Sequence, residues 1–161
     1  MQLAFKSILV ATDFGPAAQL ALEYARVFAC RFDASLRILY VAEVPPPFGA
    51  EFAGVDTSLQ AERIVEDGKR RMAAMMAGCH ENTIGQVLVG HPAEKIVEYA
   101  NDHDVDLIVM GTHGRRALAH LLMGSVAERV VRTASCPVFT VRDSDGLRFA
   151  REEATGAFVR M

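Results

Sequence analysis

The feature that most constrains this chain is a regular alternation of short apolar runs with longer segments of helical periodicity. The first run, around Ile8-Leu9-Val10, is continuously apolar, as expected of a strand that is covered on both faces. Four further runs of similar length follow it along the chain. The predicted strands span Ser7–Thr12, Ser35–Val41, Thr83–Val89, Asp106–Met110 and Pro137–Val141.

Helical segments fill the intervals between these runs. One begins at about Pro16, where proline suits a first helical turn, and another begins near Thr57. A third follows Gly90-His91-Pro92, and a fourth begins at about Ser125. We expect the first helix to bury a stripe made of Ala17, Leu20, Ala21, Tyr24 and Phe28. We expect the last helix to bury Val126, Val130 and Val131.

The resulting order of strand and helix predicts an α/β fold of the Rossmann-like class. Parallel strands need crossover connections, so an open five-stranded parallel sheet with helices on both faces is expected. With 161 residues the chain fits one domain, which we place at residues 1–142. Residues 143–161 form a polar C-terminal extension that could add a strand, wrap a partner or be disordered. Phe158 and Val159 favour a docked end.

Composition excludes several classes of function. A formal net charge of −3 without basic clusters argues against an electrostatic grip on nucleic acid. The cysteines Cys30, Cys79 and Cys136 form neither a disulfide framework nor a zinc motif. The sequence has no signal segment, and no apolar stretch approaches the roughly 18 residues of a membrane span. We therefore expect a soluble, cytoplasmic protein that binds neither membranes nor nucleic acid.

Two strand ends carry residues suited to ligand binding. Ala11-Thr12-Asp13 ends the first run, and Gly111-Thr112-His113-Gly114-Arg115 follows the fourth. Ligands of open parallel sheets bind beyond the carboxyl ends of the strands, where the strand order reverses. Glycines allow close approach of the backbone to an anion, and the helix that begins at Gly124-Ser125 offers unpaired N–H donors.

Simpler readings of these residues exist. Glycines after a strand often only make a turn, and a serine before an apolar segment is often only a helix cap. The lysine of a P-loop is missing before Ser125, and no G-x-G-x-x-G follows the first strand. The residues alone therefore support an anion site after the fourth strand, without a standard nucleotide-binding motif.

The spacing Gly111-x2-Gly114-x9-Gly124-Ser125 resembles the G-2x-G-9x-G-(S/T) motif of the universal stress protein family. Ile8–Asp13, Gly90–Ala93, Asp106–Gly111 and Ser135–Val138 are also similar to segments of that family. The resemblance covers about residues 5 to 142. It implies the strand order 3-2-1-4-5 and a homodimer formed through strand five, here Val138 to Arg142.

The resemblance also implies that the chain binds ATP, or ADP or AMP, because members with the glycine motif do so. Asp13 and the backbone of Val41 would hold the adenine end. The complete implied set is Ala11, Thr12, Asp13, Val41, Met110, Gly111, His113, Gly114, Arg115, Gly124, Ser125 and Val126. Gly111, His113 and Gly114 would cradle ribose and phosphates, and the start of the last helix would hold phosphates. Mg²⁺ could accompany them, bound mainly by phosphate oxygens and water.

The sequence offers no clear general base, so we assign no catalytic residue and no metal ligand. His113 is interpreted as a wall of the pocket rather than a base. A stress-response or regulatory protein that binds nucleotide is thus the leading hypothesis. A slow ATPase or autophosphorylating phosphotransferase, and a dimeric interaction module with a vacant site, are the alternatives. A bulky β-branched residue at Gly114 or Gly124 should abolish nucleotide binding and leave the fold largely intact.

Overall fold

The structure is a computed structural model, and it describes residues 4–44, 57–112 and 123–142. Its strands and helices follow the alternation expected from the sequence. In chain order they are β1 Ser7–Thr12, α1 Pro16–Phe32, β2 Ser35–Ala42, α3 Thr57–Met76, β3 Ile84–Val89, α4 Pro92–Asp102, β4 Leu107–Gly111, α5 Ser125–Thr133 and β5 Val138–Val141. Within the described ranges, no helix has the length and apolar character needed to cross a membrane.

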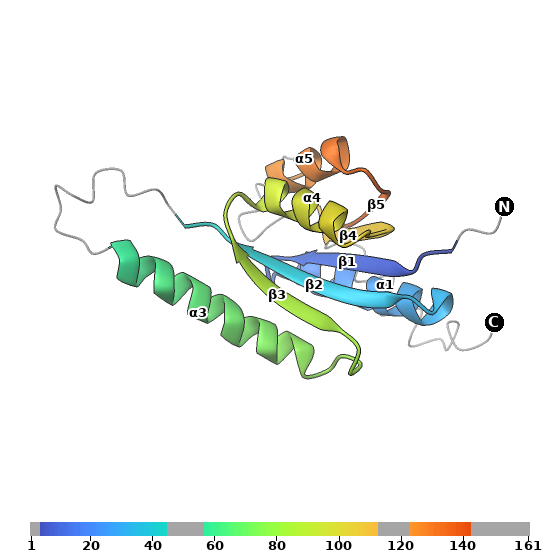
Figure 1. Cartoon of the computed structure of the whole chain (residues 1–161), viewed down its shortest axis with the longest axis horizontal. Helices are drawn as coiled ribbons and strands as arrows, with labels where there is room; N and C mark the ends of the chain where they lie inside the picture. Colours follow the sequence, from blue (N-terminus) through green and yellow to red (C-terminus); the bar gives the residue numbers. More distant parts are fainter. Residues whose placement is uncertain (1–3, 45–56, 113–122, 143–161) are drawn as a thin grey trace.

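The strands form one parallel sheet in the order β3-β2-β1-β4-β5, which confirms the predicted topology. Helices α4 and α5 lie on one face, and α1 and α3 lie on the other (Figure 1). From β1 the chain first adds β2 and β3 on one side, and it then adds β4 and β5 on the other side. The strand order therefore reverses between β1 and β4, and a crevice is expected at their carboxyl ends.

Side chains of β1 alternate between two hydrophobic cores. Ile8 and Val10 pack toward α1 and α3, whereas Leu9 and Ala11 pack toward α4 and α5. Ile8, Leu9 and Val10 are completely buried. Each such aliphatic side chain contributes about 1.5–3 kcal/mol through its removal from water. The central strand is thus fixed from both sides, and its carboxyl end is held in place.

The buried face of α1 differs from the expected stripe. Ala17 and Ala21 are buried as predicted, but Leu20, Tyr24 and Phe28 are only partly buried. Ala18, Leu22 and Ala25 are buried instead. Four of the five buried residues of α1 are alanines, and this lets the helix lie close to β4. Tyr24 and Phe28 pack at the side of the helix against the ring of Phe139 on β5, with centroid distances of 5.5 and 5.2 Å.

The other differences concern one helix face and the strand ends. In α5 the buried residues are Ala127 and Val130, and Val131 is 47% exposed. Strand β4 begins at Leu107 rather than Asp106. The Asp106 carboxylate accepts the backbone N–H groups of Lys6 and Ser7 at 2.7 and 2.9 Å. It therefore secures the start of β1 instead of extending β4.

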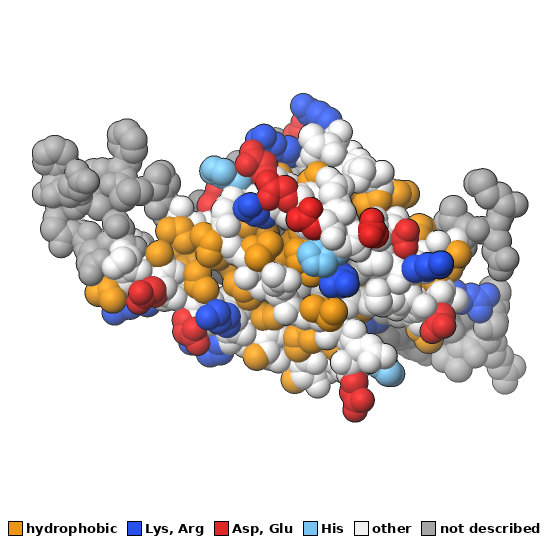
Figure 2. Space-filling view, in the orientation of Figure 1, with side chains coloured by type: hydrophobic (Ala, Val, Ile, Leu, Met, Phe, Trp, Pro, Cys, Tyr) orange, Lys and Arg blue, Asp and Glu red, His pale blue; other side chains and the backbone are white. Residues whose placement is uncertain are grey.

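The edge strand β3 leaves apolar side chains in contact with solvent. Ile84 is 46% and Val89 50% exposed. The space-filling view shows hydrophobic side chains gathered over β2 and β3, between α4 and α3 (Figure 2). Ile84 and Val89 lie on the edge strand, away from the crevice between β1 and β4 where ligand-binding residues were expected.

Candidate functional site

A cavity of about 390 Å³ lies at the carboxyl ends of β1, β2 and β4. The starts of α4 and α5 complete its walls. Nine of the predicted site residues are described by the structure, and all nine line this cavity: Ala11, Thr12, Asp13, Val41, Met110, Gly111, Gly124, Ser125 and Val126. The other three, His113, Gly114 and Arg115, lie outside the described residues. The fold thus brings together residues that are far apart in the sequence.

The loop after β1 is fixed by its own side chains. The hydroxyl of Thr12 accepts the N–H of Phe14 at 2.9 Å, and a carboxylate oxygen of Asp13 accepts the N–H of Gly15 at 2.9 Å. Phe14 adopts a left-handed conformation with φ of 63°, which is uncommon for a bulky residue. Two short side chain to backbone bonds therefore hold Asp13 in one orientation at the cavity wall.

Thr112 connects the two ends of the glycine segment. Its N–H donates to the carbonyl of Val141 at 2.8 Å, and its own carbonyl accepts the N–H of Gly124 at 2.7 Å. The residue is only 5% exposed, and its hydroxyl lies 3.3 Å from the same Val141 carbonyl. The end of β4 and the start of α5 are thus held side by side. Sequence reasoning missed this threonine, although it lies inside the glycine motif.

The start of α5 opens on the cavity without a side-chain cap. Gly124 is the N-cap residue, and the N–H of Glu128 already bonds to its carbonyl at 2.9 Å. The N–H groups of the first helical turn have no partner within the helix. They carry the positive end of the helix dipole, and this arrangement favours an anion at Ser125 and Val126.

Gly111 has a packing role that the sequence did not indicate. A Cβ atom at this position would lie 2.9 Å from Cβ of Ala17 and 3.1 Å from the Ala17 carbonyl carbon. Real Cβ atoms essentially never approach other atoms below 3.0 Å. The glycine lets α1 pack directly against the end of β4, and it lines the cavity at the same time.

The sequence model of the universal stress protein family matches residues 4–142 of this chain. The chain belongs to this family. Universal stress protein MJ0531 of Methanocaldococcus jannaschii is 36% identical over 141 residues, which cover 86% of this chain and 82% of that protein. The solved structure of MJ0577 from the same organism has a TM-score of 0.76 and 29% identity, over 87% of this chain and 97% of that one.

A third similar protein carries a ligand. A universal stress protein in complex with cAMP has a TM-score of 0.58 and 26% identity, over 88% of this chain and 99% of that chain. Nucleotide binding is therefore found among relatives with this fold.

The cavity wall of this universal stress protein is mainly apolar. In the described part of its lining, Asp13 is the sole side chain with a formal charge. Leu39 and Ile96, from β2 and α4, add apolar surface that sequence reasoning did not find. Such a cavity suits a flat, weakly polar group at depth and a polar group at the helix start.

The groups with displaced pKa values lie elsewhere. Hydrogen bonding to the Cys79 sulfur raises the pKa of Arg26, and hydrogen bonding to Glu98 raises the pKa of Lys95. Burial raises the pKa of the Cys136 thiol. None of these three side chains lines the cavity. Among the described residues, no three His, Cys, Asp or Glu side chains gather into a metal site.

Proposed function

We propose that this universal stress protein binds an adenine nucleotide, with ATP as the principal ligand, in the cavity between β1 and β4. One observation carries the proposal. An apolar cavity meets the uncapped start of α5 at the place where the strand order of the sheet reverses. The complex of a similar universal stress protein with cAMP supports the chemical class of the ligand.

The adenine ring fits the apolar part of the cavity. Leu39 and Val41 come from β2 and Met110 comes from β4, and all three side chains lie on the same face of the sheet. The backbone of Val41 offers hydrogen bonds to the ring edge, and Asp13 stands at the same end of the site. These partners can recognise adenine through its apolar faces and its polar ring edge.

The phosphates belong at the start of α5. Backbone N–H groups of Ser125 and Val126 and the Ser125 hydroxyl are suited to phosphate oxygens. His113, Gly114 and Arg115 remain part of this proposed set. Mg²⁺ fits the site as a companion of the phosphates, because it keeps several water ligands and accepts phosphate oxygens.

Calorimetry with ATP, ADP, AMP and cAMP, each with and without Mg²⁺, tests this function. We expect ATP to bind with Kd below about 100 μM, equivalent to roughly −5.5 kcal/mol. Absence of binding at millimolar ligand would refute the proposal and favour an interaction module with a vacant site. Incubation with labelled ATP and Mg²⁺ distinguishes a binding protein from an enzyme. Turnover of roughly 1 per second or faster would favour an ATPase or phosphotransferase.

We also propose that two copies pair through the edge strand β5. The carbonyls of Pro137 and Val141 accept hydrogen bonds from the N–H groups of Ile108 and Thr112. The backbone groups of these two residues therefore face β4. Because directions alternate along a strand, the backbone groups of Val138 and Thr140 face the open edge. An open edge of this kind is a template for another strand.

Thr140→Pro should convert the dimer to monomer, because proline removes an N–H that faces the open edge and leaves the bonds to β4 in place. Sedimentation or light scattering would measure the mass, and circular dichroism would check the fold. Thr140→Ser is the matched control and should stay dimeric. If folded Thr140→Pro protein has the mass of the Thr140→Ser protein, β5 is not the interface.

A further inference from the structure

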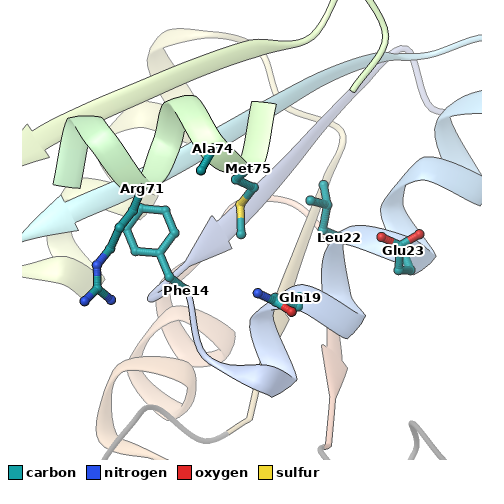
Figure 3. Close-up of a pocket in the computed structure, with 7 residues that line it drawn as sticks. All are labelled: Phe14, Gln19, Leu22, Glu23, Arg71, Ala74 and Met75. Carbon is teal, nitrogen blue, oxygen red and sulfur yellow. The ribbon is translucent and has the colours of Figure 1, made fainter. Parts of the chain in front are cut away.

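A second cavity lies on the opposite face of the sheet, between α1 and α3 (Figure 3). Its volume is about 440 Å³, and none of its lining residues lines the first cavity. Gln19, Leu22 and Glu23 come from α1, and Arg71, Ala74 and Met75 come from α3. Phe14 completes the lining. We call this cavity the α1/α3 groove.

Phe14 joins the groove to the proposed nucleotide site. Its N–H is held by the hydroxyl of Thr12, which lines the first cavity together with Asp13. Its ring projects to the other face, where it packs against Tyr40 at a centroid distance of 4.7 Å. Phe14 holds this position in the left-handed conformation, with φ of 63°. A bulky residue keeps this conformation only where its surroundings hold it, so a ligand that moves the ring also moves the loop.

The charges around the groove favour an anion at the Arg71 end. Arg70 and Arg71 both pair with the single carboxylate of Asp67, which leaves an excess of one positive charge in this cluster. At the other end, Glu23 is balanced by Arg26 at 2.7 Å. The Arg71 guanidinium carbon lies 6.0 Å from the centre of the Phe14 ring. The cation therefore lies beside the Phe14 ring, and Leu22 and Met75 provide apolar surface farther along the groove (Figure 3).

We propose that the α1/α3 groove binds a small amphipathic anion, a carboxylate or sulfonate on a compact apolar body, and that its occupancy changes the affinity for nucleotide through Phe14. The anionic group pairs with Arg71, whose planar guanidinium suits bidentate binding of such oxygens. The apolar body lies along the strip between the two helices. The coupling rests on the proposed nucleotide site, whereas binding to the groove does not.

The probe 8-anilino-1-naphthalenesulfonate has aromatic rings and one sulfonate, and its fluorescence rises in apolar surroundings. We expect saturable binding at one site. Ala74→Trp should weaken it by about tenfold or more, because the indole fills the groove from an exposed helix position. Arg71→Gln should also weaken it. Arg70→Gln is the matched control, because Arg70 pairs with the same Asp67 but does not line the groove.

Circular dichroism and urea unfolding would establish that all three variants are folded. Equal probe binding by wild type and Ala74→Trp would overturn the proposed groove site. Equal losses in Arg71→Gln and Arg70→Gln would overturn the role of Arg71 as the anion partner.

The coupling is measured as the Kd for ATP with and without saturating probe. We expect a change of about threefold or more in the wild type and none in Ala74→Trp, and ATP should change the Kd for the probe by the same factor. An unchanged Kd for ATP in the wild type would overturn the coupling. If the probe binds in the groove while no nucleotide binds at all, the proposed function fails and the groove site stands.

Discussion

Gly111→Ala will lower the free energy of unfolding by about 2–3 kcal/mol, as overpacked cores commonly do. The new methyl group would meet Cβ of Ala17 at 2.9 Å and the backbone N of Ala18 at 3.2 Å. Neither neighbour can rotate away, because one is a methyl group on a buried helix face and the other is backbone. Helix α1 must therefore shift from the sheet.

Urea unfolding measures this loss, and a protein of this size should also lose roughly 4–12 °C in Tm. Gly78→Ala is the matched control. There the new methyl group meets only the Arg26 guanidinium, at 3.5 Å, which is an ordinary contact. This control should unfold within about 0.5 kcal/mol of wild type. If the two variants unfold at the same urea concentration, the close packing of α1 on β4 is wrong.

Gly124→Val is expected to weaken ATP binding at least 100-fold, equivalent to about 2.7 kcal/mol, and to leave the fold intact. Gly124 has φ of −73° and ψ of 154°, an extended conformation that valine readily adopts. Its N–H bond to Thr112 is also compatible with a side chain. Backbone conformation therefore does not require glycine here. Under the proposed function, glycine is required here because phosphate must approach the start of α5 closely.

Calorimetry with ATP and Mg²⁺ measures this effect, with circular dichroism as the check on folding. Ser125→Ala is the comparison variant. It removes one hydroxyl and keeps the backbone N–H donors, so a loss below about tenfold is expected. Normal ATP binding by Gly124→Val would place the phosphates elsewhere, and the same holds for Gly114→Val.

The two glycines show why the same residue type needs different arguments. Both lie in the motif that the sequence singles out, and both line the cavity. The sequence treats them alike, as backbone that an anion can approach. The structure adds that Gly111 is required by α1, since the helix occupies the space of a Cβ atom. A substitution at Gly111 therefore tests the fold first, and a substitution at Gly124 tests the ligand.

Local pattern predicted most of the fold. Continuous apolar runs and helical periodicity identified the five strands and four helices of the described residues, because each pattern depends on residues close together in sequence. Strand ends were placed less well. Asp106 is polar and precedes an apolar run, but its carboxylate bonds to Lys6 and Ser7, about 100 residues away. No local pattern contains that information.

The sequence also predicted some residues of the candidate site and missed others. The glycine spacing, the loop after β1 and the family resemblance indicated nine residues that now line one cavity. Leu39 and Ile96 were missed, because on a strand and a helix they resemble any other core residue. Phe14 was also missed as a connection between two cavities. Its significance depends on a left-handed backbone angle and on Tyr40, which comes from another strand.

The sequence by itself determined the alternation of elements, the strand order through family resemblance, and the residues at the strand ends. These follow from local periodicity and from a motif of fixed spacing. Only the tertiary structure decided which face of α1 is buried, why Gly111 must be glycine, and that Phe14, next to the loop of the first site, lines a groove on the opposite face of the sheet. Those properties depend on distances between residues remote in the chain, which are set when helices pack on the sheet.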